Sequence, residues 1–239
     1  MNDLLREVIA AHGSLDRWNA FRTVSARIIS GGDFWATKGI ATDANPRSIT
    51  TKTQEELATV TPYGAPEFVM TFAPDRVVIR NSRAETIAGR DNPRTAFDGH
   101  GVDTPWDPLH RAYFSGYALW TYLSTPFLLA MPGVAVQEVA PWYESGEVWR
   151  VLRATFPPAI ATHSAVQDFY FGPDFLLRRH DYQVDVSGGL AVAQYVHDFV
   201  AVQGIRFPSR RRVHPRGADM RPDRSHTLVW IDLSDFELS

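Results

Sequence analysis

The segment that decides the fold reads LLRRHDYQVDVSGGLAVAQYVHDFVAVQGIRFPSRRRVH and covers Leu176–His214. It contains three runs rich in Val, Tyr, Phe and Ile, a composition typical of β-strands. The runs are separated at Gly188-Gly189 and Gln203-Gly204, and connections this short join antiparallel neighbours. The segment is therefore predicted to form three antiparallel strands, at Leu176–Val186, Leu190–Val202 and Ile205–His214.

Strand-like runs also fill most of the chain on either side of this segment. Each is bounded by Gly, Pro, Asn or Asp at roughly the spacing of an antiparallel meander. They are Thr23–Ser30, Asp33–Thr42, Ser48–Gln54, Glu67–Phe72, Arg76–Arg80, Val134–Val139, Val148–Phe156, Ala165–Phe171 and Thr227–Leu233. Because strands and helices do not alternate along the chain, we expect one antiparallel sheet of about ten to eleven strands.

Two stretches have the periodicity of a helix. Asp3–Ala11 places its Leu, Val and Ile residues on one face and stops at Gly13. The second helix is predicted to have Thr104 as its N-cap and Pro105 as its first residue. Large apolar residues then recur at three- and four-residue intervals, at Leu109, Tyr113, Tyr117, Trp120 and Leu123. Pro126 is predicted to end or kink this helix.

Composition excludes several classes of protein. The 239 residues carry 24 Lys and Arg against 27 Asp and Glu, a net charge of −3, and no cysteine. Without cysteine there are no disulfide bonds, no thiolate metal sites and no thiol nucleophile. The near-neutral charge argues against a nucleic-acid partner. The longest apolar runs, such as Phe127–Met131, are far shorter than the roughly 18 residues of a membrane span, so we expect a soluble protein with no transmembrane segment.

The start of the sequence bears on location. Asp3, Arg6 and Glu7 interrupt the apolar residues of the first turns. The core of a secretory signal peptide is an uninterrupted apolar stretch, so this segment is predicted to be an amphipathic helix instead. We therefore expect a cytoplasmic protein.

A single large curved sheet needs material to cover one of its faces, and the two predicted helices are the main candidates. A sheet bent into an unclosed half-barrel, with an N-terminal helix and an inserted lid helix over the concave face, leaves space between its layers. We therefore expect an α+β fold, mainly antiparallel β, in a single domain covering residues 1–239. A ligand cavity is expected between the sheet and the helices.

Three short motifs carry a resemblance to a known family. They are residues 10–18 (AAHGSLDRW), 171–179 (FGPDFLLRR) and 204–208 (GIRFP). They are similar to turn and packing motifs of the bacterial outer-membrane lipoprotein carrier-like (LolA/LolB-like) superfamily, and the order of elements agrees over most of the chain. The resemblance implies an unclosed antiparallel barrel with helices as a lid over an apolar cavity that holds acyl chains.

The hairpins of the opening segment predict which residues lie side by side. If Gly188-Gly189 is a two-residue turn, partners across it have a constant sum of residue numbers, and the same holds for Gln203-Gly204. The predicted pairs are Val184–Ala193, Tyr182–Tyr195, His180–His197, His197–Arg210 and Tyr195–Arg212. Valines and alanines share the face of this His, Tyr and Arg column, so the column is predicted to face the interior.

This column is the main candidate site, because histidine and arginine can bind a ligand carboxylate or phosphate while apolar walls hold its tail. The ligand-binding residues proposed from sequence are Arg178, His180, Tyr182, Tyr195, His197 and Arg210, together with Tyr113, Tyr117 and Trp120 on the inserted helix. The alternatives are a polar cross-strand network without a ligand, arginines that reach into solvent, and aromatics that only pack the core.

Other chemistry has weaker support. An acidic and histidine-rich segment contains Asp98, His100, Asp103, Asp107 and His110. Asp103, Asp107 and His110 have the spacing of one helix face, which a hard metal could use, but a surface loop followed by a capped helix is the preferred explanation. There is no Gly-x-Ser-x-Gly elbow and no phosphate-binding glycine loop, so no nucleotide cofactor is expected. His163-Ser164 and Asp168 supply the residue types of a triad, yet Asp168 is better explained as a partner of Arg178 or Arg179 across the hairpin.

These features predict non-catalytic binding or carrying of a hydrophobic or amphipathic, lipid-like small molecule. The alternative is a small-molecule enzyme that uses the His, Arg and Tyr cluster of the same cavity, with His180 or His197 as general base. Neither a metal nor another cofactor is expected. The identity of the ligand and the oligomeric state are left open by the sequence.

Overall fold

The computed structural model describes residues 2–41 and 44–239, and these residues form one antiparallel sheet of 13 strands. Across the sheet the strands lie in the order β6-β5-β4-β3-β2-β1-β13-β12-β11-β10-β9-β8-β7. Their bounds are β1 Thr23–Gly31, β2 Arg47–Lys52, β3 Ala58–Thr61, β4 Val69–Ala73, β5 Arg76–Arg80, β6 Thr86–Asp91, β7 Ala135–Glu144, β8 Glu147–Thr155, β9 Val166–Phe171, β10 Leu177–Val184, β11 Leu190–Val202, β12 Ile205–Pro215 and β13 Val229–Leu238. The sheet does not close, because β6 and β7 are both edge strands, so the predicted half-barrel is confirmed.

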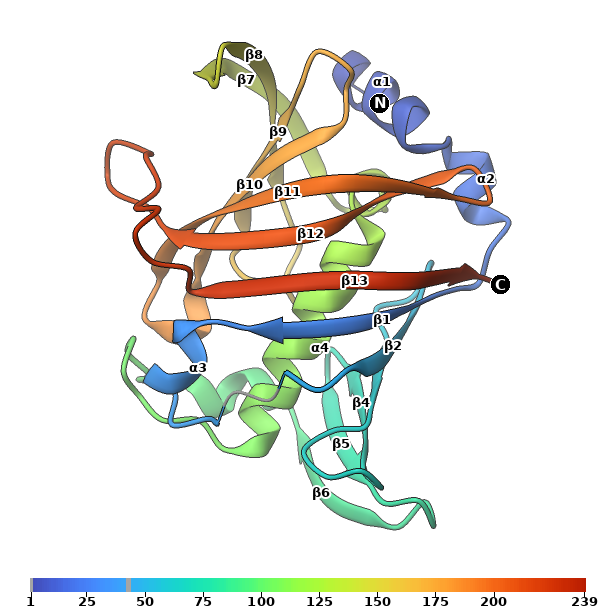
Figure 1. The fold of residues 1–239 in the computed structure, drawn as a ribbon, viewed down its shortest axis with the longest axis vertical. Helices are drawn as coiled ribbons and strands as arrows, with labels where there is room; N and C mark the ends of the chain where they lie inside the picture. Colours follow the sequence, from blue (N-terminus) through green and yellow to red (C-terminus); the bar gives the residue numbers. More distant parts are fainter. Residues whose placement is uncertain (1, 42–43) are drawn as a thin grey trace.

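The sheet consists of two meanders, β1–β6 and β7–β13, which are joined where β1 pairs with β13. Figure 1 shows the strands curving around the long helix α4 (Pro108–Ser124). The sheet has more strands than the ten to eleven predicted. Two strands were not predicted: β3, which has four residues, and β6, whose sequence TIAGRD has little β character.

The described residues also contain three shorter α-helices and three 3₁₀ helices. Their bounds are α1 Asp3–His12, α2 Leu15–Asn19, α3 Asp33–Thr37, η1 Pro93–Phe97, η2 Phe127–Ala130 and η3 Asp185–Ser187. The N-terminal helix is confirmed, and the side chain of Asn2 caps it by accepting a hydrogen bond from the Leu5 amide. No helix in residues 2–41 and 44–239 combines the length and the apolar character needed to cross a bilayer.

The prediction of a strand at Asp33–Thr42 is wrong, because Asp33–Thr37 is helix α3; Thr42 lies outside the described residues. Phe34 and Trp35 are adjacent in sequence and both buried, and both pack on Phe114 of α4, with ring centroids 5.5 and 5.9 Å away. Adjacent residues of a strand point to opposite faces, whereas one helical turn brings both rings to the same core.

The inserted helix is confirmed, but it begins three residues later than predicted. Asp107 is the N-cap and Pro108 the first helical residue. The Asp107 carboxylate accepts a hydrogen bond from the His110 amide (2.8 Å), and the His110 ring faces the Asp107 amide (3.2 Å) in a capping box. Thr104-Pro105 and Asp107-Pro108 offer the same start signal, and the second also supplies the reciprocal cap. The helix ends at Ser124, two residues before Pro126, as predicted.

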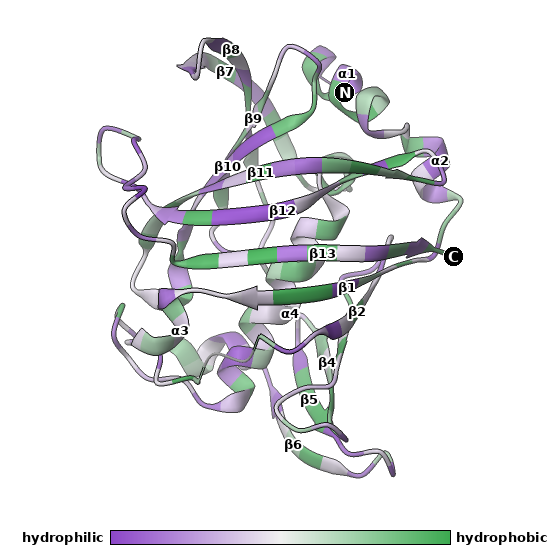
Figure 2. Ribbon diagram, viewed as in Figure 1, coloured by the Kyte–Doolittle hydropathy of each residue, from purple (hydrophilic) through white to green (hydrophobic). Residues whose placement is uncertain are grey.

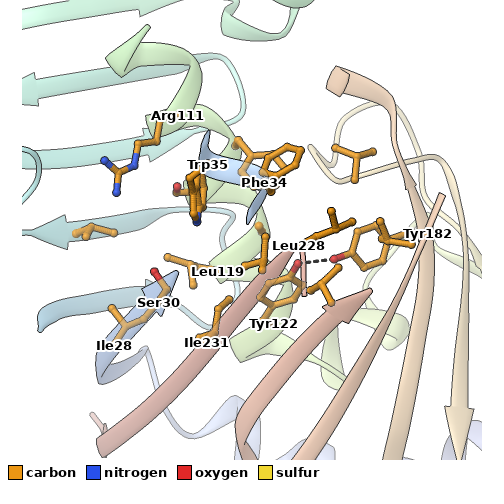
Figure 3. Close-up of a pocket in the computed structure, with 18 of the residues that line it drawn as sticks. Ile28, Ser30, Phe34, Trp35, Arg111, Leu119, Tyr122, Tyr182, Leu228 and Ile231 are labelled. Carbon is orange, nitrogen blue, oxygen red and sulfur yellow. Dashed lines mark hydrogen bonds between the residues drawn. The ribbon is translucent and has the colours of Figure 1, made fainter. Parts of the chain in front are cut away.

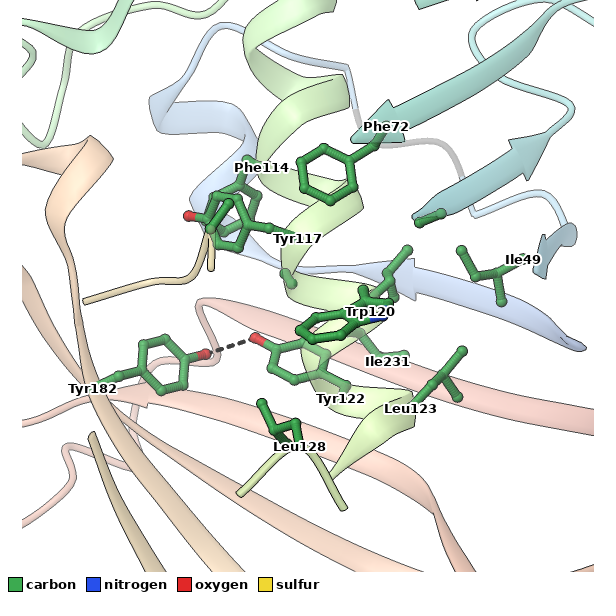
Figure 4. Close-up of a cluster of buried hydrophobic side chains, with 14 of the residues drawn as sticks. Ile49, Phe72, Phe114, Tyr117, Trp120, Tyr122, Leu123, Leu128, Tyr182 and Ile231 are labelled. Carbon is green, nitrogen blue, oxygen red and sulfur yellow. Dashed lines mark hydrogen bonds between the residues drawn. The ribbon is translucent and has the colours of Figure 1, made fainter. Parts of the chain in front are cut away.

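Helix α4 is buried on nearly every side. Thirteen of its 17 residues are buried, and Figure 4 shows Phe114, Tyr117, Trp120 and Tyr122 projecting from it toward different walls of the sheet. The backbone at Gly116 lies directly against Phe72 of β4, where an added Cβ would be 2.2 Å from the ring. The concave face is therefore filled mainly by one helix, and the width of the half-barrel is set by how that helix fits.

The two C-terminal hairpins differ in how well their register was predicted. The β11–β12 pairing is confirmed, with His197 opposite Arg210. The β10–β11 register is wrong by three residues: His180 lies opposite Gln194 and Tyr182 opposite Val192. The loop is longer than Gly188-Gly189, since η3 forms part of it. A shift by an odd number of residues moves every side chain of one strand to the other face.

Alternation along β12 also separates its three consecutive arginines, which form part of the hydrophilic stretch of that strand in Figure 2. Arg211 is buried and points toward α4, where it contacts Tyr122. Arg210 is exposed and pairs with Asp198 (3.0 Å), and Arg212 pairs with Asp232 of β13 (2.7 Å). One of the three arginines thus belongs to the interior, and two belong to the outer face.

Gly116→Ala tests the fit of α4 in the sheet. Alanine favours a helix by about 1 kcal/mol, but its methyl would overlap the Phe72 ring. We expect a net loss of roughly 1–2 kcal/mol in the free energy of unfolding, measured by urea denaturation. Ser115→Ala, at the neighbouring half-buried position, is expected to stay within about 0.5 kcal/mol of the parent. Equal or higher stability of Gly116→Ala would show that the contact is not tight.

Candidate functional site

An apolar cavity of about 50 Å³ lies between α4 and the concave face of the sheet (Figure 3). Its walls come from α3, α4 and strands of both meanders. The lining residues are Ile28, Ser30, Phe34, Trp35, Arg47, Val60, Tyr63, Arg111, Phe114, Ser115, Ala118, Leu119, Tyr122, Tyr182, Val184, Leu190, Val192, Val213, Leu228, Val229 and Ile231. This is the place where the sequence predicted a ligand cavity, although the volume is small.

Tyr122 of α4 and Tyr182 of β10 supply phenol groups to the cavity wall. Their hydroxyl oxygens lie 2.8 Å apart, which links the helix to the sheet. The Tyr122 hydroxyl also lies 2.8 Å from Nε2 of His163, and the His163 ring stacks on Tyr182 with centroids 4.0 Å apart. Burial, with a smaller effect from Arg94, lowers the pKa of His163 to about 3, so this imidazole is neutral at physiological pH.

Arg211 extends the same polar cluster. Its guanidinium donates hydrogen bonds to Oε1 of Gln194 (2.7 Å) and to the backbone oxygen of Tyr122 (2.6 Å), and it lies 4.7 Å from the centroid of the Tyr122 ring. No Asp or Glu of the described residues pairs with it. Burial lowers the pKa of Arg211 to about 10, so the side chain remains a cation inside the core. A buried cation without a carboxylate costs several kcal/mol unless other dipoles stabilise it.

His180 lies behind this cluster and does not line the cavity. It is fully buried, its Nε2 lies 2.6 Å from Oε1 of Gln167, and it stacks on Phe169 at 4.1 Å. Burial, assisted by His163 and Arg211, lowers the pKa of His180 well below its ordinary value. A neutral imidazole enclosed in this way has no open path to a substrate.

The remaining members of the predicted column do not join His180 and Tyr182. Tyr195, His197 and Arg210 lie on the outer face, because of the three-residue shift in the β10–β11 register. His197 is exposed there, on a surface remote from α4. Arg178 lies at the start of β10, paired with Asp174 of the preceding turn at 2.9 Å. The predicted interior column is therefore wrong as a structural unit, and His197 gives no geometric support to the enzyme alternative.

Tyr195 instead belongs to a small buried cluster on the outer face, which centres on Arg179. The Arg179 guanidinium is fully buried, pairs with Asp181 (2.6 Å) and Glu144 (3.2 Å), and lies over the rings of Tyr170 and Trp142 at 4.9 and 5.2 Å. Asp168 pairs with Arg153 (2.8 Å), not with Arg178 or Arg179 as predicted. Arg179 joins strands β7, β9, β10 and β11 and serves the sheet itself.

Three residues named from the inserted helix all lie in the core. Trp120 is fully buried, and its indole nitrogen donates to the Lys52 carbonyl oxygen (3.0 Å). Tyr113 packs against Phe72 (5.6 Å between centroids), and Tyr117 lies edge-on to His163 at 5.0 Å. None of the three lines the cavity, so their contact with a ligand remains a prediction.

The acidic and histidine-rich segment 98–110 forms the approach to α4. Asp107 caps the helix and pairs with Arg90 (2.6 Å), while the rings of His100 and His110 lie 4.9 Å apart. Within residues 2–41 and 44–239, no three His, Asp or Glu side chains gather as metal ligands.

A wider groove of about 420 Å³ lies beside η1 and the loop that joins β8 to β9, with Arg94 and Asp185 in its wall. Arg94 and Asp185 pair with each other across it (3.2 Å). Tyr113 of α4, one of the ligand-binding residues proposed from sequence, also lines this groove. The smaller cavity contains Tyr182 of the predicted site and is lined mainly by apolar side chains, as an alkyl chain requires.

Solved structures share this architecture. A LolA superfamily protein from Nitrosomonas europaea aligns with a TM-score of 0.53 and 14% identity, over 94% of this chain and 91% of that one. A protein described as an outer membrane lipoprotein-sorting domain, from Vibrio parahaemolyticus, aligns with a TM-score of 0.53 and 8% identity, over 99% and 91%. The fold is LolA-like. No family model and no curated protein matches the sequence.

The LolA-like fold confirms the architecture that residues 10–18, 171–179 and 204–208 implied. It also corrects one prediction. The cytoplasmic location inferred from the first residues is contradicted, because the structures that share the fold include the outer membrane lipoprotein-sorting domain. The charges near the start of the chain are those of helix α1 and do not report on location.

Four residues near the cavity were not predicted from the sequence: Tyr122, Arg211, Arg47 and Arg111. Tyr122 lies off the Tyr113–Trp120 stripe that the helical periodicity singled out. A signal was present, since residues 112–137 contain no charged side chain, which is typical of a helix buried on all sides. Side chains alternate between the two faces of a strand, so the middle residue of an Arg-Arg-Arg run lies on the opposite face from its two neighbours. The strand register alone could therefore have assigned Arg211 to the interior.

His163→Gln tests whether this histidine stays neutral. In the folded protein its pKa is about 3, whereas the unfolded value is near 6.5, so unfolding takes up a proton between these pH values. Stability is therefore lost as pH falls from about 6.5 toward 3. We expect the variant to lessen that loss by up to about 1.4 kcal/mol per pH unit, measured by urea denaturation at pH 4–7. Parallel pH profiles of the two proteins would contradict the assignment.

Proposed function

We propose that this chain binds and carries a hydrophobic or amphipathic, lipid-like molecule, without catalysis, in the cavity between α4 and the concave face. The observation that carries the proposal is an apolar cavity in this layer of a LolA-like fold. Residues 1–239 would act as a single lipoprotein carrier-like domain. Tyr182 would contact the ligand directly, and His180 would support the wall behind it.

The wall chemistry suits an alkyl or acyl chain. Apolar side chains line the cavity from α4 and from three strands: Phe114, Leu119, Val192, Val213 and Ile231. Each methylene moved from water into such surroundings contributes about 0.8 kcal/mol. Two polar groups of the wall, the hydroxyls of Tyr122 and Tyr182, are already joined to each other by a hydrogen bond.

The cavity of about 50 Å³ must widen to admit such a chain, because ligand pockets typically enclose about 300–1,000 Å³. Helix α3 is the element placed to allow this. It has five residues, and its Phe34 and Trp35 form part of the cavity wall. Lys38, just after it, donates to the carbonyl oxygens of Gly101 (3.1 Å) and Val102, so the helix and the 98–106 loop would move together.

Leu228→Trp tests the location of the ligand. Leu228 is half-buried and lines the cavity, so the larger ring would occupy the space that an apolar probe needs. We expect the parent to bind the fluorescent probe N-phenyl-1-naphthylamine, and the variant to bind it at least about tenfold more weakly, a loss of about 1.4 kcal/mol. The measurement is a fluorescence titration of the purified protein.

Val200→Trp is the matched control, since it adds the same chromophore at an exposed position of β11 outside the cavity. It is expected to keep the parent's affinity for the probe. Circular dichroism confirms that both variants are folded. Parent-like binding by folded Leu228→Trp would place the probe elsewhere and reject this cavity as the site.

A further inference from the structure

The charged residues of the cavity wall are all of one sign. The lining residues include two arginines, Arg47 and Arg111, and no Asp or Glu of the described chain. The protein as a whole carries a net charge of −3, so this is not a reflection of its composition. The charged side chains of this wall are therefore cationic in a molecule that is acidic overall.

Arg111 lies in the first turns of α4, half-buried at the edge of the cavity. Its guanidinium is 5.4 Å from the centroid of the Trp35 ring and 5.7 Å from that of Tyr63. Both rings are within the distance of a cation–π interaction, which leaves the N–H donors of the guanidinium available for hydrogen bonds. In residues 2–41 and 44–239 no carboxylate pairs with this guanidinium.

Arg111 differs in this respect from other partly buried arginines of the chain. Arg90 pairs with Asp107 at 2.6 Å, Arg153 with Asp168 at 2.8 Å, and Arg212 with Asp232 at 2.7 Å. A guanidinium without a carboxylate partner has free N–H donors. These donors can form two parallel hydrogen bonds to a carboxylate or a phosphate.

A second arginine lies at the same part of the wall. Arg47, at the start of β2, is buried and donates to the Ser30 hydroxyl on the cavity wall (2.6 Å). Burial raises the pKa of Tyr63 above its ordinary value, and Arg111 and Arg47 both oppose that rise, so both guanidinium groups act on this phenol. The Tyr63 hydroxyl donates to the Pro108 carbonyl oxygen (2.9 Å), which anchors the start of α4 here.

The apolar walls continue from this point into the core. Phe114 and Ala118 follow Arg111 by about one and two helical turns, and Tyr122 by three, all lining the cavity. A ligand with its polar end at Arg111 would thus lay its chain along one side of α4. The guanidinium of Arg111 and the apolar wall beyond it therefore suit a molecule with one anionic end and an alkyl chain.

We propose, resting on the proposed function, that the cavity selects amphiphiles with an anionic oxygen head, bound by Arg111, with the alkyl chain along α4. A carboxylate and a phosphate share this chemistry. Arg111 is then the specificity-determining residue of the site. A neutral amphiphile of the same chain length can use the apolar walls only.

The test compares three probes of one chain length: dodecanoate, dodecyl phosphate and dodecan-1-ol, each titrated as a competitor of N-phenyl-1-naphthylamine at pH 8. The parent is expected to bind at least one anion about tenfold or more tightly than the alcohol. Arg111→Gln is expected to abolish that preference and leave alcohol binding within twofold. Arg27→Gln, an exposed arginine of β1 outside the cavity, is the matched control and should keep the preference.

The outcomes separate the two proposals. A preference for dodecanoate, for dodecyl phosphate or for both supports the anion site and identifies its head group. Equal binding of all three probes, or an anion preference that persists in Arg111→Gln, overturns the anion site while binding of lipid-like ligands stands. Failure of all three probes to displace the fluorophore overturns both.

Discussion

The structure depends on burying a single helix on nearly all its sides. Helix α4 connects the two open edges of the sheet, from β6 to β7, and it crosses the concave face on the way. The sheet can therefore curve only as far as α4 allows. The contact of Gly116 with Phe72 limits how closely β4 can approach the helix. Where α4 carries Ser115, Ala118 and Leu119, beside α3, the packing leaves the cavity.

The polar groups near α4 divide into those that hold the fold and those that are open to a ligand. The hydroxyls of Tyr122 and Tyr182, with His163, tie the helix to β10 and to the loop before β9. Arg211 ties the helix backbone to β12. Arg179 performs a similar task on the outer face, with Asp181 and Glu144 as partners. Arg111 has neither a carboxylate nor a carbonyl among the described residues, and it is the one of these arginines that lines the cavity.

Much of the architecture was predictable because it depends on local signals. Proline, glycine and β-branched runs located most strands and both long helices. The errors arose where two local signals competed or where tertiary packing decided. Asp107-Pro108 prevailed over Thr104-Pro105, and Phe34-Trp35 formed a helix because both rings reach the same core. A loop longer by the η3 turn shifted the β10–β11 register by three residues and separated Tyr195 and His197 from His180 and Tyr182. The alternation of side chains along the strands could not reveal that separation. Arg111 was missed because the absence of a carboxylate partner can be seen only in the folded chain.

The central claim is that the space beside α4 takes up an apolar chain, and the absence of cysteine allows a direct measurement. A single cysteine at Ser115→Cys would stand half-buried in the cavity wall, and one at Ser209→Cys half-buried on β12 outside it. The rate at which each thiol reacts with Ellman's reagent is measured with and without dodecan-1-ol. We expect the alcohol to slow the reaction at position 115 severalfold and to leave the rate at position 209 unchanged. Equal rates with and without the alcohol at position 115 would contradict the central claim.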